Sequence, residues 1–175
     1  IEEFPCFVGT VPFTAPEAQR KNFKTFLRTT GNERFAVAAL LFMIMLPGKH
    51  PYAQQGGEDP ATNICNMDFS YPLGSRTNKK TPNGQWRFCW SHLPYKIKEA
   101  FYETFRKDGQ YSKENERLSV LKWVELFTEY LWLLETGKFE QQDPESVELF
   151  PSRFKNAGNA PLQSCAVCGR TFPDD

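Results

Sequence analysis

The run FAVAALLFMIML, Phe35–Leu46, is the most apolar stretch of the chain. A helix that spans a bilayer needs about 20 apolar residues, so this shorter run predicts a buried core helix. It is apolar on every side, and a helix without a polar face must be surrounded by the rest of its domain. Asn32 is the expected N-cap, Glu33 lies in the first turn, and PGKHPY (47–52) ends the helix.

Helical periodicity returns after a long irregular stretch. Residues 53–92 are rich in Gly, Pro, Asn, Gln and Ser, and we expect a short helix there at most. The next segment, LPYKIKEAFYETF (93–105), predicts an amphipathic helix because Ile97, Phe101 and Phe105 recur at a spacing of four. No useful length of sequence alternates at period two, so the expected class is mainly α with long ordered loops.

A last helix is predicted from about Leu118, and Gly137 closes it as a C-cap. Its apolar residues are expected to lie mainly along one face: Leu121, Val124, Leu126, Phe127, Leu131 and Leu134. The chain then becomes polar and ends in CAVCGRTFPDD. We therefore expect a helical domain over residues 1–137 and a polar tail with a CxxC knuckle over residues 138–175.

Composition narrows the classes of function. Lys plus Arg and Asp plus Glu number 21 each, and this balance argues against a binder of nucleic acid. Neither an export signal nor a membrane span is expected. The five cysteines are an odd number, which favours reduced thiols or a metal site over a disulfide framework. A cytoplasmic protein is the default expectation.

The segment GTVPFTAPE (9–17) predicts a rigid, turning loop near the start of the chain. Pro12 and Pro16 fix φ and push the residue before each toward extended geometry. Gly9 permits backbone conformations that other residues resist. The loop ends on Glu17, a carboxylate that either faces water or is held by an arginine. On composition alone, a surface loop that enters a helix would explain it.

The same segment resembles the end of the activation segment of eukaryotic-like Ser/Thr protein kinases, where Gly-Thr and an aromatic precede Ala-Pro-Glu. Later features follow in the family's order: an acidic residue before a buried helix (NERFAVAALLFMIML), a Gly-x-x-Pro-aromatic phrase (GKHPY), and an arginine before the last helix (ENERLSVLKWVELF). The resemblance covers about residues 7–135 and is best for bacterial kinase-like proteins with a cysteine-containing tail. It implies a kinase C-lobe-like helical bundle that lacks the N-lobe.

The resemblance also implies roles for individual residues. Thr10 would contact the catalytic aspartate, and Glu17 would pair with the arginine before the last helix, here Arg117. Glu33 stands where an aspartate usually supports the catalytic loop, and Leu118 stands where proline is usual. The implied substrate-binding residues are Gly9, Thr10, Val11, Pro12, Phe13 and Thr14.

The catalytic parts of a kinase lie upstream of Ala-Pro-Glu in this family. This sequence has no Gly-rich loop, no His-Arg-Asp and no Asp-Phe-Gly, so we expect a fragment that is inactive alone. The resemblance implies an intact parent that uses ATP and Mg²⁺ to phosphorylate protein hydroxyls. Implied partners are a peptide substrate, the N-lobe and the upstream C-lobe. A pseudokinase-type interaction module and an unrelated helical zinc-binding domain remain alternatives.

Cys165 and Cys168, in CAVCG, have the spacing of half a tetrahedral zinc site. Cys89 and His92, in CWSH, would make a reasonable second half. Alternatively, Cys89 is a core cysteine and His92 a satisfied loop histidine. A third possibility places the remaining zinc ligands beyond Asp175 or on another chain. A redox CxxC is disfavoured because no βαβ pattern surrounds it.

Three further features are expected to have ordinary roles. His50, beside a proline in GKHPY, is interpreted as structural. The basic clusters KNFK (21–24) and RTNKK (76–80) are interpreted as solvated, with docking of an acidic or phosphorylated partner as the alternative. Cys6 and Cys65 are interpreted as ordinary thiols.

Overall fold

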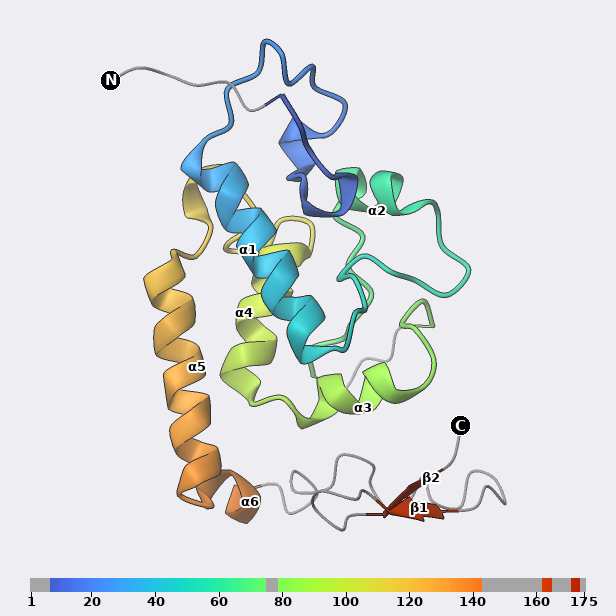
Figure 1. Cartoon of the computed structure of the whole chain (residues 1–175), viewed down its shortest axis with the longest axis vertical. Helices are drawn as coiled ribbons and strands as arrows, with labels where there is room; N and C mark the ends of the chain where they lie inside the picture. Colours follow the sequence, from blue (N-terminus) through green and yellow to red (C-terminus); the bar gives the residue numbers. More distant parts are fainter. Residues whose placement is uncertain (1–6, 75–78, 143–161, 165–170, 174–175) are drawn as a thin grey trace. The chain divides into compact units, whose positions relative to one another are not determined.

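A computed structural model describes residues 7–74, 79–142, 162–164 and 171–173 (Figure 1). Contacts divide the chain into two compact units, Ile1–Trp132 and Leu133–Asp175. The first unit is mainly helical, and its described residues contain no strand, so the predicted class of a helical, C-lobe-like bundle is confirmed. The predicted domain boundary after residue 137 stays a prediction.

The first unit consists of helices joined by ordered loops. In chain order its elements are η1 (Val11–Phe13), η2 (Pro16–Ala18), α1 (Thr30–Met45), α2 (Pro60–Asn66), α3 (Gln85–His92), α4 (Tyr95–Phe105), η3 (Glu114–Glu116) and α5 (Val120–Glu135), whose last three residues fall in the second unit. Figure 1 shows α1 and α4 near the centre and α5 running alongside α4.

Two helices, α2 and α3, lie where we expected one short helix at most. Helix α2 begins at an Asp-Pro pair: the Asp59 carboxylate accepts hydrogen bonds from the backbone N–H groups of Ala61 and Thr62, and Pro60 occupies the first turn. Both residues are typical of a helix N-terminus. The prediction was wrong because the high Gly and Pro content of residues 53–92 suggested a loop, whereas the Asp59-Pro60 pair is a local signal that starts a helix.

Helix α1 corrects the predicted N-cap. Thr29, not Asn32, is the cap: its hydroxyl accepts the Asn32 N–H at 3.2 Å, and the Asn32 side-chain oxygen accepts the Thr29 N–H at 2.9 Å. This reciprocal pair is a capping box with asparagine at the third helical position. Helix α1 is also not surrounded on every side, because Leu40 and Ile44 are 51% and 64% exposed.

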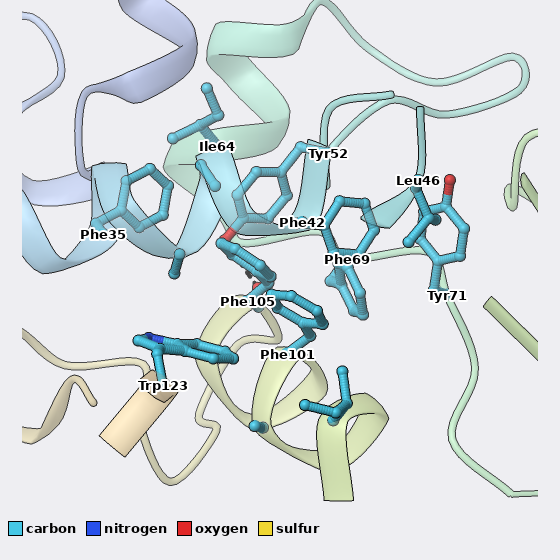
Figure 2. Close-up of a cluster of buried hydrophobic side chains, with 14 of the residues drawn as sticks. Phe35, Phe42, Leu46, Tyr52, Ile64, Phe69, Tyr71, Phe101, Phe105 and Trp123 are labelled. Carbon is cyan, nitrogen blue, oxygen red and sulfur yellow. Dashed lines mark hydrogen bonds between the residues drawn. The ribbon is translucent and has the colours of Figure 1, made fainter. Parts of the chain in front are cut away.

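Phe42, on α1, lies at the centre of an aromatic core (Figure 2). Its ring centroid lies 5.2 Å from those of Tyr71 and Phe101 and 5.7 Å from that of Phe105, in edge-to-face arrangements. Such pairs contribute about 0.5–1.5 kcal/mol each beyond the area that they bury. Because Phe101 and Phe105 lie on α4 at the predicted spacing, the predicted buried face of α4 is confirmed.

Helix α5 packs through a different face from the predicted one. Trp123 is buried, and its ring centroid lies 4.9 Å from that of Phe101. The core-facing stripe is Trp123, Leu126, Phe127 and Tyr130. Four of the predicted face residues are exposed: Leu121, Val124, Leu131 and Leu134. The large aromatic side chains at i, i+4 and i+7 decide the orientation because they bury the most apolar area.

In the second unit, α5 ends and α6 (Lys138–Gln142) follows. Gly137 has a φ of +67°, and its N–H donates to the Leu134 carbonyl, in agreement with the predicted C-cap. Strands β1 (Leu162–Ser164) and β2 (Thr171–Pro173) pair antiparallel and were not predicted. No helix within the described ranges has both the length and the apolarity needed to cross a membrane.

Candidate functional site

The turn Thr10–Thr14, which contains η1, is held by hydrogen bonds to its own carbonyl groups. The Gln19 side-chain amide donates to the carbonyls of Val11 at 3.0 Å and Thr14 at 2.7 Å. The Thr14 hydroxyl donates to the Thr10 carbonyl at 3.0 Å. A buried amide without a hydrogen-bond partner lowers the stability of the folded protein. These bonds therefore favour the one backbone conformation of the turn in which the Gln19 amide is satisfied.

The first half of this turn presents its side chains to solvent. Gly9, Thr10 and Val11 are exposed, and Val11 retains 47% of its accessible surface. Thr14, at the other end, is buried. A Cβ at Gly9 would clash with the ring of Phe23, so a larger residue here would require that ring to move. The turn is therefore fastened on its inner side and exposed at Thr10 and Val11.

His50 connects the turn to the segment that follows α1. Its Nε2 atom lies 2.7 Å from the Pro12 carbonyl oxygen, and its Nδ1 atom lies 3.2 Å from the backbone nitrogen of Tyr52. Because Nδ1 accepts the Tyr52 N–H, the proton of the neutral ring belongs on Nε2. Burial lowers the pKa of His50, and the bond to Pro12 opposes that effect only in part.

Glu17 and Arg117 form a bidentate ion pair. Arg117 Nη1 and Nη2 donate to Glu17 Oε1 and Oε2 at 2.6 and 2.7 Å. Arg117 Nη1 also donates to the Gly31 carbonyl at 2.9 Å, and the guanidinium carbon lies 5.4 Å from the centroid of the Phe35 ring. The pair therefore joins η2 to the first turn of α1 and to the segment before α5.

Burial alone would raise the pKa of Glu17, but hydrogen bonding with Arg117 and the charge of that residue outweigh it and hold the pKa below the ordinary value of 4.5. Asn32 contributes as well, because its side-chain nitrogen donates to Glu17 Oε1 at 2.6 Å. The sequence did not indicate this role of Asn32 or the role of Gln19. Gln19 lies two residues after Ala-Pro-Glu and is buried in the structure, but no pattern in the sequence marks it.

Glu33 follows Asn32 in sequence but has no hydrogen bond to Glu17 or Arg117 among those found in the described residues. Its side chain is 54% exposed, and its Oε1 lies 3.2 Å from Arg28 Nε. The described residues include no catalytic loop for it to contact. Its implied role as the support of such a loop therefore stays a prediction.

The predicted metal ligands are only partly within the described residues. Cys89 and His92 lie on α3, both half-buried, and burial raises the pKa of the Cys89 thiol. Cys165 and Cys168 fall outside the described residues. Among the residues that the structure does describe, no group of three or more His, Cys, Asp or Glu side chains could hold a metal ion. The zinc site stays a prediction.

Comparison with known proteins gives a distant relationship to protein kinases. The chain is 28% identical over 110 residues to "Protein kinase YegI" of Escherichia coli O157:H7, and equally to the protein of that name in Escherichia coli strain K12. Each match covers 59% of this chain and only 17% of the relative. No family model matches the chain. No solved structure matches it either.

Proposed function

We propose that this chain is the peptide-binding, helical part of the C-lobe of a Ser/Thr protein kinase. In this proposal the exposed Thr10 and Val11 face a peptide hydroxyl and the residue that follows it. The intact parent transfers a phosphoryl group from ATP to that hydroxyl. The fragment contributes substrate binding and support, and the catalytic residues belong to the rest of the parent.

The observation that carries the proposal is the Glu17–Arg117 ion pair. It joins the Ala-Pro-Glu motif to the arginine before the last helix, across 100 positions of sequence, as the kinase resemblance implies. Since Arg117 is buried and bidentate, the pair holds the start of the helical core against the exposed turn. The distant similarity to a protein kinase supports the same interpretation.

ATP and Mg²⁺ are not assigned to side chains of this chain. The described residues offer no group of acidic or histidine ligands for a metal ion, and the sequence has no Gly-rich loop for phosphates. Both would bind to other parts of the parent.

A kinase-derived interaction module is the second candidate. The observation that favours it is the apolar surface on two helices: Leu40 and Ile44 on α1, and Leu121, Val124 and Leu131 on α5, are exposed. A pseudokinase could use such surfaces to bind other protein segments. This candidate shares the C-lobe-like fold but needs no phosphoryl transfer.

The tail adds a separate proposal, a structural zinc ion bound by Cys165 and Cys168. Its support is the CxxC spacing and the antiparallel pairing of Ser164 with Thr171 in the strands on either side. The other two ligands are Cys89 and His92 or residues outside this chain.

Phosphoryl transfer by the longer natural polypeptide that contains this sequence tests the proposal. We expect radiolabel from γ-labelled ATP to pass to Ser/Thr peptides in the presence of Mg²⁺, and Glu17→Ala to reduce it. Peptide binding without transfer would favour the interaction module. If the folded wild-type polypeptide neither binds a peptide nor transfers phosphate, both candidates are wrong.

A further inference from the structure

A hydrogen bond between the His50 ring and the Pro12 carbonyl joins the turn Thr10–Thr14 to the segment after α1. Gln19 and Thr14 hold the carbonyls of Thr10, Val11 and Thr14 from within the loop itself. The Pro12 carbonyl has a different partner, the imidazole Nε2 of His50 at 2.7 Å. Because Pro12 lies between the exposed Val11 and the half-buried Phe13, this bond acts on the part of the turn that faces solvent.

The ring of His50 is itself fixed in orientation. The Tyr52 backbone N–H donates to Nδ1, and the ring of Tyr52 lies 5.9 Å from that of His50. Tyr52 in turn is fully buried, and its hydroxyl donates to the Phe105 carbonyl at 2.8 Å. The turn is thus connected through His50 and Tyr52 to the end of α4 in the core.

We infer that His50 is the positioning residue of this turn, and that its Nε2–H tautomer sets the orientation in which Thr10 and Val11 are presented. The anchoring follows from the geometry, and its effect on peptide binding rests on the proposed function. Protonation would remove the lone pair of Nδ1 that accepts the Tyr52 N–H. The Tyr52 contact that orients the ring therefore requires neutral His50, whereas Nε2–H can donate to the Pro12 carbonyl in either protonation state.

Few ionisable side chains lie on the elements around His50, so a pH-dependent change in the turn can be assigned to protonation of its ring. The turn Thr10–Thr14 has no ionisable side chain, and α1, which contacts η1, carries only Glu33 and Arg34, both near its N-terminus. On the segment of His50 itself the ionisable neighbours are Lys49, whose ammonium lies over the Trp86 ring, and Tyr52. Further ionisable side chains on or beside the elements that contact these turns are Glu17 of η2, which pairs with Arg117, and Cys65 of α2, with Glu58 and Asp59 before α2.

The test is an NMR comparison of the 175-residue wild type with three variants. His50→Phe keeps an aromatic ring but removes both bonds, and His50→Gln restores a side-chain N–H donor. Ile97→Val, in the buried face of α4, is the matched control because it removes one core methyl group and leaves the residues of the turn unchanged.

In the wild type we expect ring ¹⁵N shifts typical of the Nε2–H tautomer, and amides of Thr10, Val11 and Thr14 that titrate with the His50 ring. His50→Phe should displace these amides and speed hydrogen exchange about tenfold at the amides of Phe13 and Thr14, which donate within the turn. His50→Gln should restore them in part, and Ile97→Val should leave them unchanged. An Nδ1–H tautomer, or turn amides that stay in place in His50→Phe, would overturn the inference.

Binding to an array of Ser/Thr peptides separates the two levels of the proposal. If wild type binds peptides and His50→Phe binds them equally well, the positioning role is wrong and the proposed function stands. If His50→Phe displaces the turn but wild type binds no peptide, the anchor stands and the proposed function fails.

Discussion

Arg117 donates hydrogen bonds from its two Nη atoms to the two carboxylate oxygens of Glu17, at 2.6 and 2.7 Å, across 100 positions of the sequence. The guanidinium is buried, whereas the carboxylate is one-third exposed. A planar, bidentate contact of this kind fixes both distance and direction between the segments that it joins. The rigid turn before Glu17 therefore has a defined position on the helical core.

Replacing Glu17 should destabilise the fold. Breaking a buried ion pair by removing one partner costs roughly 3–5 kcal/mol, and the partial exposure of Glu17 places Glu17→Ala at about the lower end of that range. Urea unfolding followed by circular dichroism measures this change. Glu33→Ala is the matched control, because that exposed pair with Arg28 contributes about 1 kcal/mol or less. Equal losses in the two variants would contradict the structural role of Glu17.

The same pair predicts an acid-dependent loss of stability. The pKa of Glu17 is lowered in the folded state, so the unfolded chain binds a proton more readily and the stabilisation is complete above the ordinary value of 4.5. It is lost as the pH falls through the lower, folded pKa. Because other carboxylates titrate in the same window, the quantity to measure is the difference in unfolding free energy between wild type and Glu17→Gln. That difference should shrink below pH 4.5, and a constant difference would contradict the assignment.

The aromatic core predicts a large cost at Phe42. Phe42→Ala should lower the unfolding free energy by about 3–5 kcal/mol, because the ring is fully buried among Tyr71, Phe101 and Phe105. Leu40→Ala, two residues earlier on α1, is the control: the Leu40 side chain is 51% exposed, so the cost should stay below about 1 kcal/mol. Thermal unfolding of the two variants checks the difference. A similar cost at both sites would mean that α1 is buried on every side, as its sequence first suggests.

The orientation of α5 can be tested with a charge. Leu121→Lys should change stability by about 0.5 kcal/mol or less, because Leu121 is 74% exposed. Trp123→Lys should unfold the domain, since the ring of Trp123 is buried against Phe101. Circular dichroism at 25 °C is sufficient for both. The reverse pattern would restore the face predicted from sequence.

The helices α1, α4 and α5 show how much of the fold could be predicted from the sequence. The apolar run of α1 and the four-residue spacing of α4 predicted both helices, because burial of one continuous face is a local property of sequence. The exposed face of α5 could not be predicted in the same way: leucines occur on both sides of this helix, and only the position of Phe101 decides that Trp123 is buried. Its orientation is a tertiary property.

In the candidate site, too, local features could be predicted from the sequence, and contacts between distant residues could not. The contact between Glu17 and Arg117 could be predicted only because the kinase resemblance supplied the pairing of two distant residues. Gln19 and Asn32, which complete the hydrogen-bond network, have no pattern that marks them in a single sequence. His50 was interpreted as structural, and its contact with Pro12 depends on how the chain returns after α1.

The zinc proposal has a direct measurement. X-ray fluorescence at the zinc edge on the purified chain should show about one zinc ion per chain or, with a shared site, half of that. Cys165→Ser together with Cys168→Ser should remove the signal. Cys65→Ser is the control, because Cys65 is a free cysteine on α2 and lies in neither proposed ligand pair. A zinc-free wild type would end the proposal.

The central claim is that the exposed turn binds a peptide. NMR titration of the wild-type chain with a Ser/Thr peptide selected from the array tests it most directly, together with Val11→Asp. Val11 is 47% exposed, so this variant should keep the wild-type melting temperature. We predict shift changes centred on Gly9–Thr14 and binding about tenfold weaker in Val11→Asp. Shift changes confined to other surfaces, with unchanged affinity in Val11→Asp, would contradict the claim.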